Sequence, residues 1–200
     1  MKTVTYKEFL EFDPCWLEDE EKTKKLEEIG RRKERWTALD VLNLPEEEVN
    51  DKDKLWTVLR PEFMEEMDLH EFACWCAEDA LSRVKNPDPR SLAAIEAKRK
   101  WMRGEIGDEE LRKAEKDAWS ATDAAEAAGA TAWAAGAAAG AAADAAYAAA
   151  YNVAYNAARA AACAGTFERI IRSRQVAKLR ELLEKKSIPG EKGESHYEAV

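Results

Sequence analysis

The chain contains little that would support catalysis. It has only two histidines, His70 and His196, and none of the G-x-S-x-G, Walker or G-x-G-x-x-G patterns occurs. Nucleophilic, phosphoryl-transfer and hydride-transfer chemistries therefore lack the residues on which they usually depend. We expect a protein that binds a partner rather than an enzyme, and we expect no cofactor.

His70 begins the run His-Glu-Phe-Ala-Cys, which is similar to part of a zinc-binding helix. A zincin needs a second histidine four residues further on, and here that position is Cys74. His70 and Cys74 could supply two zinc ligands, but no partner motif offers the other two. We therefore expect no metal site, and a buried His70 whose hydrogen bonds are satisfied.

Strand patterns and a secretion signal are also missing. No segment alternates between apolar and polar residues for long enough to predict a strand, so the expected fold class is all-α. The first eight residues have no apolar segment of the kind that directs secretion, which favours a cytoplasmic location. Thiols stay reduced in the cytosol, so we expect free and mostly buried cysteines at Cys15, Cys74, Cys76 and Cys163.

The run from Gly136 to Gly140 has the small-xxx-small spacing of packed membrane helices. However, Asp144, Asn152 and Arg159 interrupt the stretch, and the large apolar residues of a membrane span are absent from it. We expect no membrane insertion.

Lysine and arginine are outnumbered by acidic residues, 31 to 40, which gives a net charge of −9. A general nucleic-acid binder is normally basic, so a nucleic-acid partner is not expected. A negative surface suits a basic protein partner, although it also serves simple solubility.

Apolar spacing, prolines and glycines divide the chain into helices. We expect an N-terminal helical segment over residues 1–60, a helical core over 61–186 and a mobile tail over 187–200. Within these, the expected helices run from Glu18 to Gly30 or beyond, Asp53 to Leu59, Glu62 to Val84, Leu92 to Arg103, from Asp108 onward, and from Thr166 to Lys186.

Residues 117–164 are more than half alanine. Alanine is the strongest helix former, and one unbroken helix of this length would be roughly 70 Å long. A break near Gly129 or Gly140 would give two Ala-rich helices that pack closely on each other, or on a second copy of the chain. Large apolar residues are concentrated in the first half and the last helix, so we expect the core there.

On a helical wheel the Ala-rich segment has one smooth alanine face and one face of aromatic, glycine and acidic residues. That mixed face could pack against the core or form a binding groove, and basic residues near the C-terminus could hold phosphate. The candidate binding residues are Trp119, Trp133, Asp144, Tyr147, Tyr151, Tyr155, Arg159, Arg169 and Arg172.

Three stretches carry a resemblance to a known family. They are Phe-Ala-Cys-Trp-Cys-Ala-Glu-Asp-Ala-Leu at 72–81, Asn-Pro-Asp-Pro-Arg at 86–90, and Ala-Ile-Glu-Ala-Lys-Arg-Lys-Trp-Met-Arg-Gly-Glu-Ile at 94–106. With the Ala-rich run that follows, residues 60–165 resemble the immunity-five-like family of immunity proteins from polymorphic toxin systems. The section before them looks like versions carried by phages and mobile elements. The resemblance implies inhibitory binding, and it transfers no catalytic residue.

Two hypotheses follow. In the first, the protein binds and neutralises a protein toxin or an immune effector, and its acidic surface speeds association with a basic target. In the second, it sequesters a nucleotide that acts as an immune signal, with bases stacked on the aromatic face and phosphate held by arginines.

Overall fold

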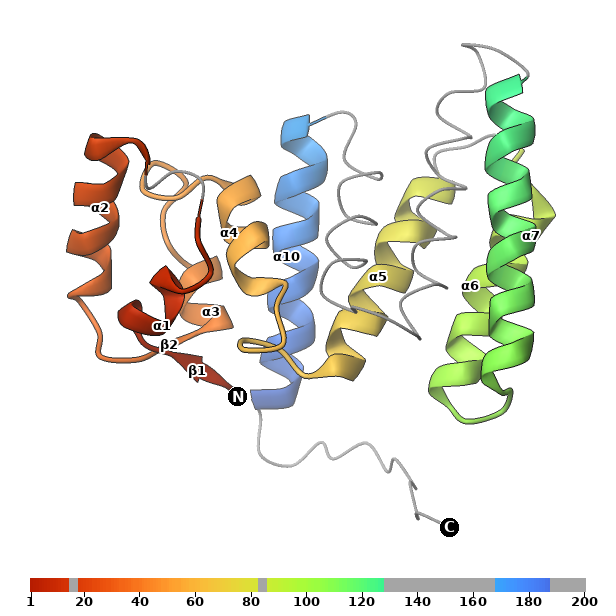
Figure 1. Ribbon diagram of the computed structural model, residues 1–200, viewed down its shortest axis with the longest axis horizontal. Helices are drawn as coiled ribbons and strands as arrows, with labels where there is room; N and C mark the ends of the chain where they lie inside the picture. Colours follow the sequence, from red (N-terminus) through yellow and green to blue (C-terminus); the bar gives the residue numbers. More distant parts are fainter. Residues whose placement is uncertain (15–17, 83–85, 128–167, 188–200) are drawn as a thin grey trace.

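The computed structural model describes residues 1–14, 18–82, 86–127 and 168–187. These residues form a single all-α domain whose helices lie in a row, from α2 at one end to α6 and α7 at the other (Figure 1). The predicted fold class is confirmed. The described helices are α1 (Tyr6–Leu10), α2 (Glu20–Gly30), α3 (Ala38–Leu42), α4 (Asp51–Val58), α5 (Glu66–Leu81), α6 (Pro89–Met102), α7 (Asp108–Ala127) and α10 (Glu168–Ser187).

Local sequence signals explain where most of these helices begin. Asp88 accepts a hydrogen bond from the Arg90 backbone N–H, and Pro89 occupies the first helical position of α6, as predicted. Side chains of Asp19 and Asn50 accept bonds in the same way at α2 and α4. Each of these caps supplies an acceptor for a backbone donor that has no partner within the helix.

Two reciprocal capping boxes lie on either side of a short strand pair. Thr5 and Glu8 begin α1, and Thr37 and Asp40 begin α3. The strand β1 (Thr3–Val4) directly precedes the first box. It pairs antiparallel with β2 (Trp36–Thr37), whose last residue, Thr37, begins the second box. Two-residue strands are too short to produce an alternating pattern, which is why the sequence did not indicate them.

Helix α5 is shorter at its start than predicted and is rotated slightly from the expected orientation. It begins at Glu66 rather than Glu62, because Phe63 and Met64 belong to the turn that follows α4. The three- and four-residue spacing of apolar residues predicts that Met67, Cys74 and Ala77 face inward. Cys74 and Ala77 are fully buried, but Met67 is 40% exposed, and Phe72, which lies outside that spacing, is fully buried.

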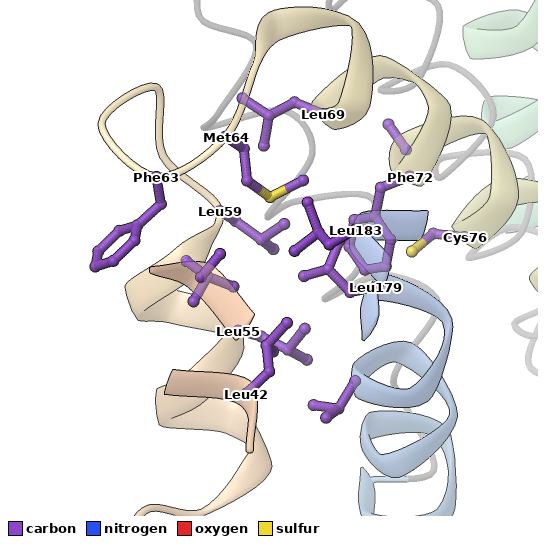
Figure 2. Packing of buried hydrophobic residues seen from close by; sticks show 14 of the residues in the cluster. Leu42, Leu55, Leu59, Phe63, Met64, Leu69, Phe72, Cys76, Leu179 and Leu183 are labelled. Atoms are coloured by element: carbon purple, nitrogen blue, oxygen red, sulfur yellow. The ribbon is translucent and has the colours of Figure 1, made fainter. Parts of the chain in front are cut away.

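The main hydrophobic core joins the first half of the chain to its last described helix, as predicted. Leu179 and Leu183 of α10 lie beside the Phe72 ring of α5, with Leu55 and Leu59 of the α4 region close by (Figure 2). Leu179 and Phe72 have no exposed surface. The core therefore crosses the expected boundary near residue 60.

Basic residues of α10 strengthen this packing from the edges. The Arg180 Nε donates to the Leu42 carbonyl oxygen at 3.1 Å, Arg174 pairs with Asp79, and Lys186 pairs with Asp68. Arg174 and Arg180 are among the basic residues near the C-terminus considered for phosphate binding, and here they contact α5 and α3.

A smaller apolar cluster lies between α6 and α7, where Ala94, Leu111 and Ala118 are buried. Arg99 of α6 reaches back to α5 and donates to Glu71 and Glu78, both at 2.8 Å. Most of the Ala-rich segment lies outside the described residues, so the predicted break near Gly129 or Gly140 does too. Among the described helices, no stretch is both long and apolar enough to cross a bilayer.

The position of α10 predicts a large cost for truncating Leu179. Leu179→Ala leaves a cavity at the contact with α5 and should lower the free energy of unfolding by about 2–5 kcal/mol. Urea denaturation measures this change, and Leu92→Ala is the matched control because Leu92 is 48% exposed. Equal, small effects of the two substitutions would show that α10 does not belong to the core.

Candidate functional site

An apolar pocket lies in the N-terminal half, between β1, α1, α2 and the segment that leads into α4. It encloses about 270 Å³. Its lining consists of Val4, Thr5, Tyr6, Phe9, Lys22, Lys25, Leu26, Ile29, Gly30, Trp36, Val41, Leu44, Glu46, Glu47, Glu48, Val49, Asn50, Asp53, Thr57 and Phe63. Most of the lining is aromatic and aliphatic, and its charged residues come from the first half of α2, from the segment between α3 and α4, and from the first turn of α4.

Close packing at one end of α2 sets the shape of the pocket. A Cβ atom on Gly30 would lie 2.5 Å from Cδ2 of Tyr6, so the absence of a side chain there lets the Tyr6 ring approach α2. Ile29, the buried residue of α2, faces the same interior. The C-terminal end of α2 is therefore fixed against α1.

The mouth of the pocket is bridged by polar contacts between α2 and the segment after α3. Lys25 donates to the Glu47 carbonyl oxygen. Just beyond α2, the Arg32 Nη1 lies 2.6 Å from the Glu48 carboxylate. Within the described part of the chain, the Glu47 carboxylate itself forms no hydrogen bond or ion pair, and it is exposed.

The pocket is suited to binding rather than to chemistry. Its lining contains neither histidine nor cysteine. The Thr5 hydroxyl donates to Glu8 at 2.9 Å and the Thr57 hydroxyl donates to the Asp53 carbonyl oxygen at 2.8 Å. Burial raises the pKa of Tyr6, which keeps its phenol protonated. These groups can hold an apolar ligand but include no activated nucleophile.

A second unusual feature is a buried basic cluster between α5 and α6. His70 and Lys98 have no exposed surface, and both contact the Trp101 ring. The Lys98 Nζ lies 3.9 Å from the Trp101 ring centroid, and the His70 ring meets Trp101 edge-on at 5.3 Å. The Trp101 Nε1 donates to Asp108 at 2.8 Å, which fixes the indole between the two basic groups.

The prediction that His70 has satisfied hydrogen bonds is wrong. Among the described residues neither ring nitrogen has a hydrogen-bond partner, and a carboxylate oxygen of Glu66 is 3.6 Å from Nε2. Burial, and then the charge of Lys98, lowers the pKa of His70 to about 3. Burial also lowers the pKa of Lys98 to about 7, and its amine likewise has no hydrogen-bond partner in the part of the chain that the structure describes. Close packing between α5 and α6 outweighs the cost of burying these groups.

Cys74 and Cys76 are free and buried, as predicted, and they face different neighbours. Cys76 receives a weak hydrogen bond from Gln175 of α10 at 3.8 Å, whereas Cys74 lies on the α6 side of α5, near Arg99 and Lys98. Burial raises the pKa of Cys74 to about 12 and that of Cys76 well above its ordinary value. Both thiols are therefore protonated and poorly nucleophilic at neutral pH. Cys15 and Cys163 lie outside the described residues, and among the described ones no three potential ligands come together as a metal site.

Of the binding residues proposed from the sequence, the three that the structure describes, Trp119, Arg169 and Arg172, do not line the pocket. Trp119 is half-buried against the α6–α7 cluster, and Arg172 is half-buried on α10. Arg169 belongs to the first turn of α10. Trp133, Asp144, Tyr147, Tyr151, Tyr155 and Arg159 lie outside the described residues.

The pocket could not be predicted from the sequence because its residues come from five separate segments. Phe9, Trp36 and Phe63 all look like ordinary core residues when each is considered alone. The one local signal was the charged run Glu46-Glu47-Glu48 directly after Leu44-Pro45, next to large apolar residues.

No protein-family model, curated protein or solved structure matches the chain. The likeness to immunity proteins therefore depends on the quoted residues alone.

The buried amine of Lys98 predicts a substitution that stabilises the protein. Its pKa of about 7 in the folded protein lies below the ordinary 10.5, so the unfolded chain binds the proton more tightly. The free-energy cost of burying the charged amine is present in full below about pH 7 and disappears as the pH rises through 10.5. Lys98→Met should therefore raise the free energy of unfolding by about 1–3 kcal/mol at pH 7.

Urea denaturation at several pH values measures this gain, which should shrink between pH 7 and pH 10. Lys100→Met is the control, because Lys100 is a half-exposed neighbour that pairs with Glu96. Destabilisation by Lys98→Met, or a gain that does not change with pH, would mean that the amine is not buried as described.

Proposed function

We propose that the protein is a non-enzymatic binding protein that neutralises a protein toxin or immune effector. The observation that carries this proposal is the apolar pocket of about 270 Å³ with charged residues at its mouth. Protein interfaces draw most of their affinity from a few apolar or aromatic side chains that fill such a pocket, surrounded by a polar rim. The resemblance to immunity proteins supplies the biological class of the partner.

The charge of the chain supports a basic target. A net charge of −9 raises the rate of encounter with a positively charged protein and disfavours acidic ones. Nuclease-like effectors, which bind nucleic acid, carry such positive surfaces. Affinity would then come from the pocket, and selectivity from the surrounding carboxylates.

Contacts of the last helix occupy two arginines that a phosphate site could otherwise use, Arg174 and Arg180. A phosphate site needs arginines whose guanidinium groups are available. Arg174 pairs with Asp79 and Arg180 donates to the Leu42 carbonyl oxygen, so both are engaged within the fold. Sequestration of a nucleotide is the competing outcome of the experiment below.

Native mass spectrometry of the protein purified from its host background tests the proposal. We expect a stoichiometric protein adduct that is lost in Val49→Phe, which fills the pocket, and retained in Leu92→Phe, which adds the same ring at an exposed position. The purified adduct protein must also lose its toxic or enzymatic activity when the wild-type chain is added back. A nucleotide-mass adduct, or a protein adduct whose activity is unaffected, would contradict the proposal.

A further inference from the structure

We propose that the pocket holds an apolar side chain of the partner that is followed closely by a lysine or arginine. This inference rests on the proposed function and specifies the chemistry of the same site.

The size and lining of the pocket favour a side chain. Sites for drug-sized ligands enclose about 300–1,000 Å³. At about 270 Å³, this pocket is at the small end and suits one or two side chains. Phe9, Trp36 and Phe63 give it flat aromatic walls, and rigid walls hold an aromatic or branched aliphatic group at little entropic cost.

Charge at the mouth determines what must accompany that side chain. The lining contains four carboxylates, Glu46, Glu47, Glu48 and Asp53, against two lysines, Lys22 and Lys25. Glu48 already pairs with Arg32, and Asp53 accepts from the Asn50 side chain at 2.7 Å. The Glu47 carboxylate forms no hydrogen bond or ion pair with the described residues, while its carbonyl oxygen accepts from Lys25. A partner lysine or arginine next to the apolar side chain would pair with Glu47.

A random-peptide phage library selected on the full-length chain tests the occupant. We expect enriched peptides to share an aromatic or branched aliphatic residue with a lysine or arginine one to three positions away. These peptides should no longer be enriched when the chain carries Val49→Phe or Leu44→Phe, each of which fills the pocket with a ring. They should still be enriched on the Leu92→Phe variant. Melting curves verify that each variant is folded. An acidic or purely polar consensus, or enrichment that survives both filling variants, would overturn the proposal.

Synthetic peptides from that selection test the charge. Glu47→Gln should weaken binding about 3- to 10-fold and reduce its salt dependence, whereas Glu34→Gln, which removes an exposed charge outside the lining, should leave both unchanged. Equal effects of the two glutamate substitutions would contradict the role assigned to Glu47.

Failure here is distinguishable from failure of the proposed function. If a protein adduct persists in Val49→Phe and is still neutralised, the proposed function stands but the pocket is not the binding site. If the wild-type chain neutralises no partner protein, the proposed function itself is contradicted.

Discussion

Contact between the last described helix and the helices of the first half supports every other feature of this fold. Leu179 and Leu183 pack beside Phe72, and the hydrophobic cluster continues through Leu55 and Leu59 to the walls of the pocket at Phe9 and Phe63. Of the helices that line the pocket, α1 and α3 have only five residues each. Helices of that length are not stable alone, so their positions depend on the core behind them.

The opposite end of the molecule is held by a different balance of forces. Between α5 and α6, Arg99 bridges two glutamates, while His70 and Lys98 are buried without hydrogen-bond partners among the described residues. Burying such groups opposes folding, and the apolar contacts of Trp101 and Ile95 offset it. The helices α1 and α2, which line the pocket, lie on the side of α4 away from α10 and α5 (Figure 1).

Much of the fold was predictable because its signals are local. Asp88-Pro89 marks the start of α6, Asp108-Glu109-Glu110 starts α7, and the concentration of large apolar residues in the first half and the last helix placed the core there. Three-dimensional features were not accessible in this way. Met67 has the correct spacing but is exposed, since helix orientation depends on neighbours far away in sequence. The pocket combines residues between Val4 and Phe63 that only tertiary packing brings together, and the unpaired nitrogens of His70 leave no mark in the sequence.

The central claim is that the pocket between α1, α2 and α4 is where a partner protein binds. Hydrogen exchange of the whole chain, compared with and without its purified partner, tests this most directly. The account predicts new protection over residues 22–30 and 44–53, with α6 and α7 unchanged. Protection confined to residues 89–127, with the pocket segments exchanging as in the free protein, would contradict it.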